Sequence, residues 1–379
     1  MQNTLNVQQQ GGGVLIRASG AADIAAMQRS FMDQIAGLGI HQAVEIIRAD
    51  DGKSVRFRLR DVVARDWAPE FDTLQLCAKL QLHPKISALD LEKEIIVSML
   101  LGPVEFEYPS YAEFAASVRI RRNIVAAARR TALSFHTSKI ERPEEYWTYT
   151  EGRGFTLLPG KSLIEALVMA TQPEVSGQQY SFSCYRASEY VIVLGIAQEL
   201  ASSNPALLDQ LQQHWESRAI MSRQFHDVFL REHGSMGEPL PPKYYVPGDR
   251  LWFRNPEQRS ADVEGFEGSW VIYLGEGLFS NFWTCEKPYS MAAKCIEIYH
   301  WRDGVYQDAD GKLKMDESIV DARVRGTMSD HAAVELILER MLRMRDPSEI
   351  YGEGGCIDAS REYPRLICPG TVDMVLPDK

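Results

Sequence analysis

The sequence predicts an α+β protein in which mainly helical segments precede an antiparallel sheet. Stretches with apolar residues at helical spacing fall largely before residue 204. After a loop rich in Gly and Pro at 234–242 come short runs of β-branched and aromatic residues, which are typical of strands. The chain contains no internal repeat. Its 379 residues suit a main domain with additions at both ends.

Residues 14–100 are predicted to form an accessory α+β segment. Residues 1–13 are rich in Gln and Gly and are predicted to be disordered. A helix is expected next, because Ile24, Met27, Phe31 and Ile35 follow helical spacing. Residues 44–61 predict two strands joined at "DDGK", with arginines on the alternate, solvated face. We assign these arginines no function.

Three helices are predicted in the following core, which we place at 101–315. The first spans 113–133 and carries the Ala-rich turn "NIVAAAR", which allows close packing against a neighbour. The second covers about 162–171. The third follows the polar loop "SGQQYS", begins at Cys184 and ends near Ala201, so a thiol lies at a helix N-terminus.

The rest of the chain predicts strands and then a C-terminal extension. The segments "DRLWFRNP", "SWVIYLGEG" and "CIEIYHW" are interpreted as antiparallel strands. Residues 316–379 form the extension, with one amphipathic helix that begins at Ser329 or Asp330 and a loop-rich final segment.

Composition excludes several classes of partner. The 41 Lys and Arg against 52 Asp and Glu give a net charge of −11, which disfavours nucleic acid and anionic membranes. No apolar run approaches the roughly 20 residues that span a bilayer, and no targeting signal is recognisable, so a cytoplasmic location is expected. The six cysteines form no CxxC pair and are expected to be free thiols. No metal or cofactor motif is present, so none is expected.

Cys184 is the candidate nucleophile. Unpaired N–H groups and the helix dipole stabilise a thiolate at a helix N-terminus. A polar partner for the thiol would come from the strand that contains "EGSWVIYLG". The alternative from these residues alone is a buried structural cysteine.

Five motifs in register resemble a known family. They are "GPVEFEYPS", "RRNIVAAAR", "YSFSCYRASEYVIV", "PGDRLWFRNPE" and "GSWVIYLGEG", over roughly residues 100–300. In order and spacing they are similar to the small bacterial protein-glutamine γ-glutamyltransferases associated with spore-coat cross-linking. The resemblance implies a papain-like thiol hydrolase core, with the nucleophile at a helix N-terminus packed on an antiparallel sheet, and a role in sporulation.

The resemblance places the family's nucleophile on Cys184. Ser183 and Ser269 stand where the family has glutamates. Glu267 lies two residues from Ser269 on the expected strand, so it can project from the same face and supply the carboxylate. Asn281 is the expected third polar residue that orients this base.

The resemblance also implies a reaction and its partners. The Cys184 thiolate would form a thioester with a protein glutamine, and a protein lysine would resolve it into an isopeptide cross-link. The backbone N–H of Cys184 and a donor from "GQQYS", such as Gln178 or Gln179, would hold the oxyanion, with Tyr180 nearby. His300 is interpreted as a structural residue. Proteins with accessible Gln and Lys are the expected partners.

Two alternatives remain open at this stage. Ser183 and Ser269 also fit a non-enzymatic relative that keeps the fold as a binding scaffold. A thiol amidase or deamidase would use the same Cys184 with water as the acceptor. A carboxylate within hydrogen-bond reach of Cys184 would favour the enzyme.

Overall fold

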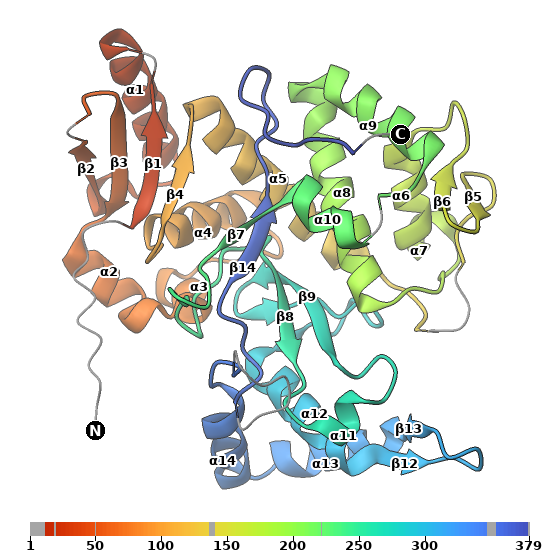
Figure 1. The fold of residues 1–379 in the computed structure, drawn as a ribbon. Coiled ribbons are helices and arrows are strands. Elements are labelled where there is room, and N and C mark those ends of the chain that lie inside the picture. Colours follow the sequence, from red (N-terminus) through yellow and green to blue (C-terminus); the bar gives the residue numbers. More distant parts are fainter. Residues whose placement is uncertain are drawn as a thin grey trace.

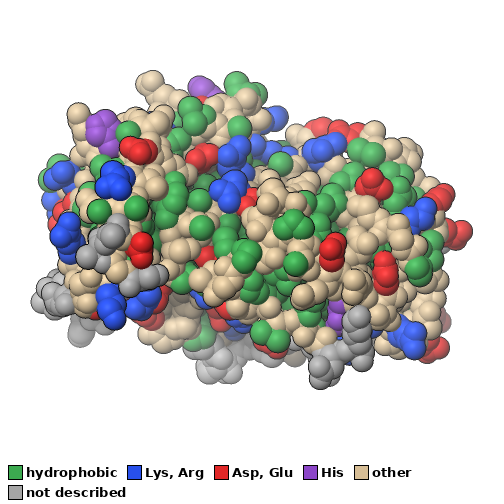
Figure 2. All heavy atoms as spheres, turned by 90° about the horizontal axis from the view of Figure 1, so that it is seen from above, with side chains coloured by type: hydrophobic (Ala, Val, Ile, Leu, Met, Phe, Trp, Pro, Cys, Tyr) green, Lys and Arg blue, Asp and Glu red, His purple; other side chains and the backbone are tan. Residues whose placement is uncertain are grey.

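The computed structural model describes residues 12–18, 20–49, 51–135, 141–220, 222–346 and 354–377. Figure 1 shows three regions: a sheet of strands β1 to β4 with its helices, a helical region around α5 and α8, and a second sheet with α11 to α14 below it. Acidic and basic side chains are interspersed on the face seen in Figure 2. Among the described helices, none has the length and apolarity to cross a membrane.

The first sheet has the strand order β2-β3-β1-β4. Its strands are β1 (Gly13–Arg17), β2 (Val44–Arg48), β3 (Ser54–Leu59) and β4 (Glu105–Tyr108). The predicted hairpin of β2 and β3 and the predicted helix, α1 (Ala21–Gly37), are confirmed. β4 pairs in parallel with β1, so this sheet extends beyond the predicted boundary at residue 100. Of the segment 1–13, residues 1–11 lie outside the described residues, and Gly13 begins β1.

Helices α2 (Asp61–Trp67), α3 (Leu76–Leu80) and α4 (Ala88–Leu100) lie between β3 and β4 in the chain, and the helical region follows β4. The helical region contains α5 (Tyr111–Arg130), α6 (Leu163–Thr171), α7 (Pro173–Ser176), α8 (Cys184–Ser203), α9 (Pro205–Ser217), α10 (Ser222–Phe229) and the hairpin of β5 (Trp147–Thr150) and β6 (Gly154–Leu157). The three helices predicted here are confirmed as α5, α6 and α8.

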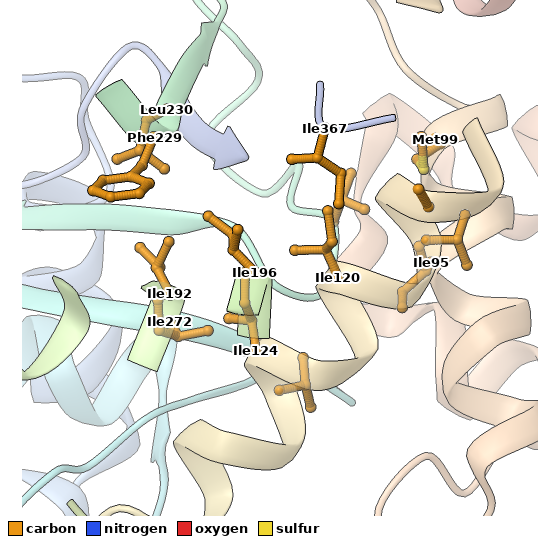
Figure 3. Packing of buried hydrophobic residues seen from close by; sticks show 14 of the residues in the cluster. Ile95, Met99, Ile120, Ile124, Ile192, Ile196, Phe229, Leu230, Ile272 and Ile367 are labelled. Carbon is orange, nitrogen blue, oxygen red and sulfur yellow. The ribbon is translucent and has the colours of Figure 1, made fainter. Parts of the chain in front are cut away.

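α5 and α8 pack closely together, as the Ala-rich turn predicted. A Cβ atom on Gly195 of α8 would lie 2.5 Å from Ile124 Cγ1 and 2.9 Å from the Ile124 backbone nitrogen. Figure 3 shows Ile120 and Ile124 of α5 beside Ile192 and Ile196 of α8 in this core. Because no side chain separates the helices at Gly195, the position of α8 is fixed against α5.

The second sheet has six strands in the order β11-β10-β9-β8-β14-β7, and its pairings are antiparallel. The strands are β7 (Leu230–His233), β8 (Arg250–Arg254), β9 (Gly268–Gly275), β10 (Leu278–Phe279), β11 (Tyr289–Ser290) and β14 (Arg361–Pro364). β8 and β9 confirm two of the three predicted strands. β14, from the predicted C-terminal extension, lies between β8 and β7, as Figure 1 shows, so the extension completes the sheet.

The third predicted strand, "CIEIYHW", is wrong, because these residues lie within helix α12 (Met291–Gly304). The Ser290 hydroxyl caps α12 by accepting a hydrogen bond of 3.1 Å from the Ala293 N–H. Cys295, Ile296 and Ile298 are all fully buried, so the helix carries apolar residues on more than one face and lacks a helical stripe. Such a pattern imitates strand alternation.

Short elements complete the region around α12. They are α11 (Gln258–Ala261), β12 (Val305–Gln307), β13 (Leu313–Met315), α13 (Glu317–Met328) and α14 (His331–Met341). α14 begins after Asp330, as predicted, whereas α13 was not predicted.

A buried ion pair joins α5 to the turn before β8. Arg121 Nη1 donates to Asp249 Oδ1 at 2.7 Å, and Asp249 Oδ2 accepts the Val246 N–H at 2.7 Å. Gly248 has a φ of +89°, and a Cβ atom there would lie 2.9 Å from the Arg121 Cα atom. The "RRNIVAAAR" and "PGDRLWFRNPE" motifs therefore meet in a structural contact that orients the sheet against α5.

Candidate active site

Cys184 is the first residue of α8 and is half-buried. Ser183 is the N-cap residue, and its hydroxyl oxygen accepts a hydrogen bond of 3.3 Å from the Arg186 N–H. The cap satisfies one of the free N–H groups of the first turn. The Cys184 sulfur is consequently held at the positive end of the α8 dipole.

Arg250 of β8 locks the first turns of α8 onto the sheet. Its guanidinium lies 4.6 Å from the Tyr185 ring centre and 4.0 Å from the Trp270 ring centre. Arg250 Nε donates to Ser188 Oγ at 2.9 Å, and Nη1 donates to the Glu362 carboxylate at 3.0 Å. Because Glu362 belongs to β14, the C-terminal strand helps to position the nucleophile.

Cys184 opens into a cavity of about 290 Å³ between α8, the start of β9, and helices α12 and α13. The lining residues are Phe135, Cys184, Gly265, Phe266, Gly268, Ser269, Trp283, Tyr289, Ala293, Lys294, Glu297, Trp301, Glu317, Asp321 and Val324. Gly268 is required at the wall, because a Cβ atom there would lie 2.2 Å from Trp252 Nε1. The cavity thus combines aromatic side chains with charged side chains, and the charged ones come from α12 and α13.

The surroundings of Cys184 push its pKa in opposite directions. Burial raises the pKa of the thiol, and the Glu267 carboxylate adds to the increase. The backbone N–H groups of Trp270 and Tyr185 and the positive charge of Lys294 oppose this increase. The net pKa lies above that of a free cysteine, so these stabilising groups offset the cost of burial only in part.

Lys294 is a buried cation in the same cavity. It is 2% exposed and lies in the first turns of α12. Its Nζ atom donates to Glu297 Oε2 at 2.9 Å and lies 3.4 Å from the centre of the Tyr289 ring. Burial alone would lower the pKa of Lys294, but the Glu297 carboxylate and Tyr289 raise it above its ordinary value. Lys294 therefore keeps its charge at neutral pH.

Glu317 and Asp321, one turn apart on α13, complete an acidic wall together with Glu297. Burial raises the pKa of Glu317, and its two neighbours Asp321 and Glu297 raise it further. α13 comes from the predicted C-terminal extension, so this part of the chain contributes directly to the cavity.

Glu267, the predicted base, and Asn281, which was predicted to orient it, are not among the residues that line the cavity. Ser269 lines the cavity, whereas Glu267 is exposed, and its Oε1 accepts a hydrogen bond of 3.4 Å from the Gly265 N–H. The Asn281 side chain is engaged in its own loop, because Nδ2 donates to the Lys287 carbonyl at 3.0 Å and Oδ1 accepts from the Trp283 N–H at 3.1 Å. The structure thus brings Cys184 and Ser269 together without Asn281.

The remaining predicted residues are distributed around the site. Ser183 is exposed and lines a neighbouring cavity of about 400 Å³. Gln179 lines a third cavity together with Cys285, and Tyr180 is buried, with its carbonyl accepting from the Ser134 N–H. The predicted structural role of His300 agrees with its contacts, although it belongs to a helix: its ring joins Asp303 and Thr327 at 2.7 Å each.

Sequence reasoning missed Lys294, Glu297, Glu317 and Asp321. A strand at 295–301 left Lys294 in a loop, and α13 was not expected. The capping residues Ser290 and Asp316 were the available signals, since each accepts hydrogen bonds from the first turn of its helix. All six cysteines are free, as predicted. Within the described ranges, no group of three or more residues could hold a metal ion.

Comparisons with known proteins agree with the motif resemblance. A profile of the family described as protein-glutamine gamma-glutamyltransferase matches residues 74–351. A protein of that name from Bacillus subtilis (strain 168) is 26% identical over 191 residues, 48% of this chain and 69% of the relative. A Bacillus cereus (strain G9842) relative of the same name is 26% identical over 211 residues, 52% of this chain and 69% of the relative.

A solved structure was also matched. It is a transglutaminase from Geobacillus stearothermophilus without its C-terminal extension, at 16% identity and a TM-score of 0.38. The match covers 56% of this chain and 98% of that chain.

Proposed function

Because the chain belongs to the protein-glutamine gamma-glutamyltransferase family, we propose that it joins glutamine and lysine side chains of proteins through a thioester on Cys184. One observation carries the proposal. Cys184 lies at the N-terminus of α8 and opens into a cavity that has a buried cation and an acidic wall. This arrangement suits a thiolate nucleophile with an incoming amine.

The reaction would proceed in two steps. The Cys184 thiolate attacks the γ-carbonyl carbon of a glutamine, the carbon–nitrogen bond breaks, and the nitrogen leaves as ammonia after taking up a proton. The lysine amine then attacks the thioester carbon, and the carbon–sulfur bond breaks to return the thiolate. The backbone N–H of Cys184, at the free end of α8, is the expected oxyanion donor. Gln179 lines another cavity, so we do not include it in this proposal.

The acidic wall supports an amine as the acceptor. Glu297, Glu317 and Asp321 carry negative charge toward the space in front of Cys184, which favours the approach of a lysine ammonium. The proton that the ammonium group must lose before the amine attacks passes to water.

Incorporation of a fluorescent primary amine into a glutamine-rich acceptor protein tests the proposal. Cys184→Ala should abolish incorporation, whereas Cys285→Ala, at a half-buried thiol outside the cavity, should leave it unchanged. Glu267→Gln should not abolish incorporation, because this exposed carboxylate raises the pKa of the Cys184 thiol and does not stabilise the thiolate. Equal incorporation by native protein and Cys184→Ala would contradict the proposal.

One observation favours the non-enzymatic scaffold as the second candidate. Ser183 and Ser269 carry no carboxylate, and Glu267 bonds to the Gly265 N–H at the rim. A native chain that neither incorporates the amine nor releases ammonia would support this candidate. Ammonia release without amine incorporation would instead indicate a deamidase.

A further inference from the structure

The strongest unexplained feature of the cavity is the buried Lys294. A lysine side chain that is 2% exposed is rare, because burial removes its ammonium group from water. The apolar contacts of α12 do not require a cation at this position, since Cys295, Ile296 and Ile298 already fill the core beneath the sheet. Lys294 instead lines the same cavity as Cys184.

We propose that Lys294 is the electrostatic partner of the Cys184 thiolate and takes the place of a carboxylate base at this site. The inference rests on the proposed role of Cys184 as nucleophile. Lys294 is a permanent cation, so it does not accept the thiol proton, which passes to water; it stabilises the negative sulfur that remains. It acts through Cys184 and is a positioning residue.

Charged and titratable groups face Lys294 from several elements. Glu297 comes from its own helix, and Tyr289 from β11. Glu317 and Asp321 line the cavity from α13, and Cys184 lines it from α8. Every one of these groups is neutral or negative, so Lys294 is the cation of the described lining. Glu297 partly neutralises it and thereby sets how much positive charge reaches the sulfur.

This relationship makes two substitutions act in opposite directions. Lys294→Met removes the cation, so the thiolate should form only at higher pH. Glu297→Gln removes the counter-charge and leaves Lys294 facing Cys184, so the thiolate should form at lower pH. Damage to the packing of α12 would instead shift the pKa of the Cys184 thiol in the same direction in both variants.

The experiment measures the rate of Cys184 alkylation by iodoacetamide between pH 6 and about 11.5, with the Cys184 peptide quantified by mass spectrometry. In each case the thiolate sulfur bonds to the methylene carbon and iodide leaves. Lys294→Met should move the midpoint of the pH profile of alkylation upward by about one pH unit. Alkylation at pH 7 should become about tenfold slower. Lys294→Arg should restore most of the native profile. Lys287→Met, an exposed lysine outside the cavity, is the matched control and should not change it.

A native profile in Lys294→Met, or shifts of the same sign in Lys294→Met and Glu297→Gln, would overturn the inference. If Lys294→Met does not fold, Glu297→Gln decides alone: a downward shift supports the inference and any other result contradicts it. The assay contains neither glutamine nor amine substrate, so it is independent of transamidation. Opposite shifts without amine incorporation would keep the role of Lys294 while the proposed function fails.

Discussion

The two faces of the six-stranded sheet are built on different principles. On one face, α8 packs against α5 and β9, where Gly195 touches the backbone of Ile124. On the other face, α12 carries the ion pair of Lys294 and Glu297 into the cavity. Successive residues of β9 alternate between the two faces. We infer that close apolar packing fixes the position of Cys184, whereas the charged helix sets its reactivity.

The largest expected effect comes from removing Asp249, the buried carboxylate that pairs with Arg121 of α5. Asp249→Ala would leave Arg121, which is fully buried, with an uncompensated charge. We expect a loss of about 4 kcal/mol in the free energy of unfolding, measured by urea denaturation. Asp66→Ala is the control, because Asp66 forms an exposed pair with Lys79, and it should change stability by less than about 1 kcal/mol. Equal effects would show that burial of the pair is unimportant.

Glu94, a buried carboxylate for which no ion pair is recorded among the described residues, should behave differently, because burial outweighs the opposing charge of Arg129. Glu94 of α4 is fully buried and accepts hydrogen bonds from the Tyr273 hydroxyl at 3.2 Å and the Glu276 N–H at 2.9 Å. Burial raises its pKa to about 7. Between the unfolded pKa near 4.5 and this value, the folded state holds the extra proton, so stability falls as pH rises through this range.

Glu94→Gln should therefore flatten the pH profile of stability. From pH 4.5 to 7, the native protein should lose about 2 to 3 kcal/mol more than the variant does, a difference that chemical denaturation at each pH can measure. Glu92→Gln, a partly exposed glutamate of the same helix that pairs with Arg122, is the control. Parallel profiles for native protein and Glu94→Gln would mean that Glu94 titrates as an exposed carboxyl group does.

The contact between α5 and α8 can be tested with two helical glycines. Gly195→Ala would place a Cβ atom 2.5 Å from Ile124 Cγ1 and should destabilise the fold by about 2 kcal/mol. Gly326→Ala on α13 meets no atom within 4 Å, so it should stabilise the protein by about 0.5 to 1 kcal/mol through helix propensity. Thermal unfolding measures both effects. A gain in both variants would show that α8 can move away from α5.

The same contrast explains what the sequence could predict. α1, α5 and the hairpin of β2 and β3 have one buried face, so their periodicity is visible locally. Cys184 was found through its helix start and its motif. α12 is buried on several faces and was mistaken for a strand, which hid Lys294. β14 is short and ends in Pro364, and its pairing with β7 and β8 depends on residues far away in the chain.

The smallest expected effect comes from substitutions in the acidic wall. These substitutions test whether the wall attracts the amine without taking part in the chemistry at Cys184. Replacing Glu317 by Gln and Asp321 by Asn should raise the KM for the fluorescent amine a few-fold, because the wall no longer attracts an ammonium group. The stability should stay within about 0.5 kcal/mol, since both residues lie on the surface of α13 rather than in the core.

The dependence of KM on salt concentration distinguishes electrostatic attraction of the amine from a structural change in the cavity. For the native protein, KM should rise between low and physiological ionic strength, whereas the double variant should show little salt dependence. Asp310→Asn, in the exposed turn between β12 and β13, should behave as the native protein does. If the double variant kept the native KM and its salt dependence, the amine would approach Cys184 by another route, and the charge on the α12 and α13 side would act on the sulfur alone.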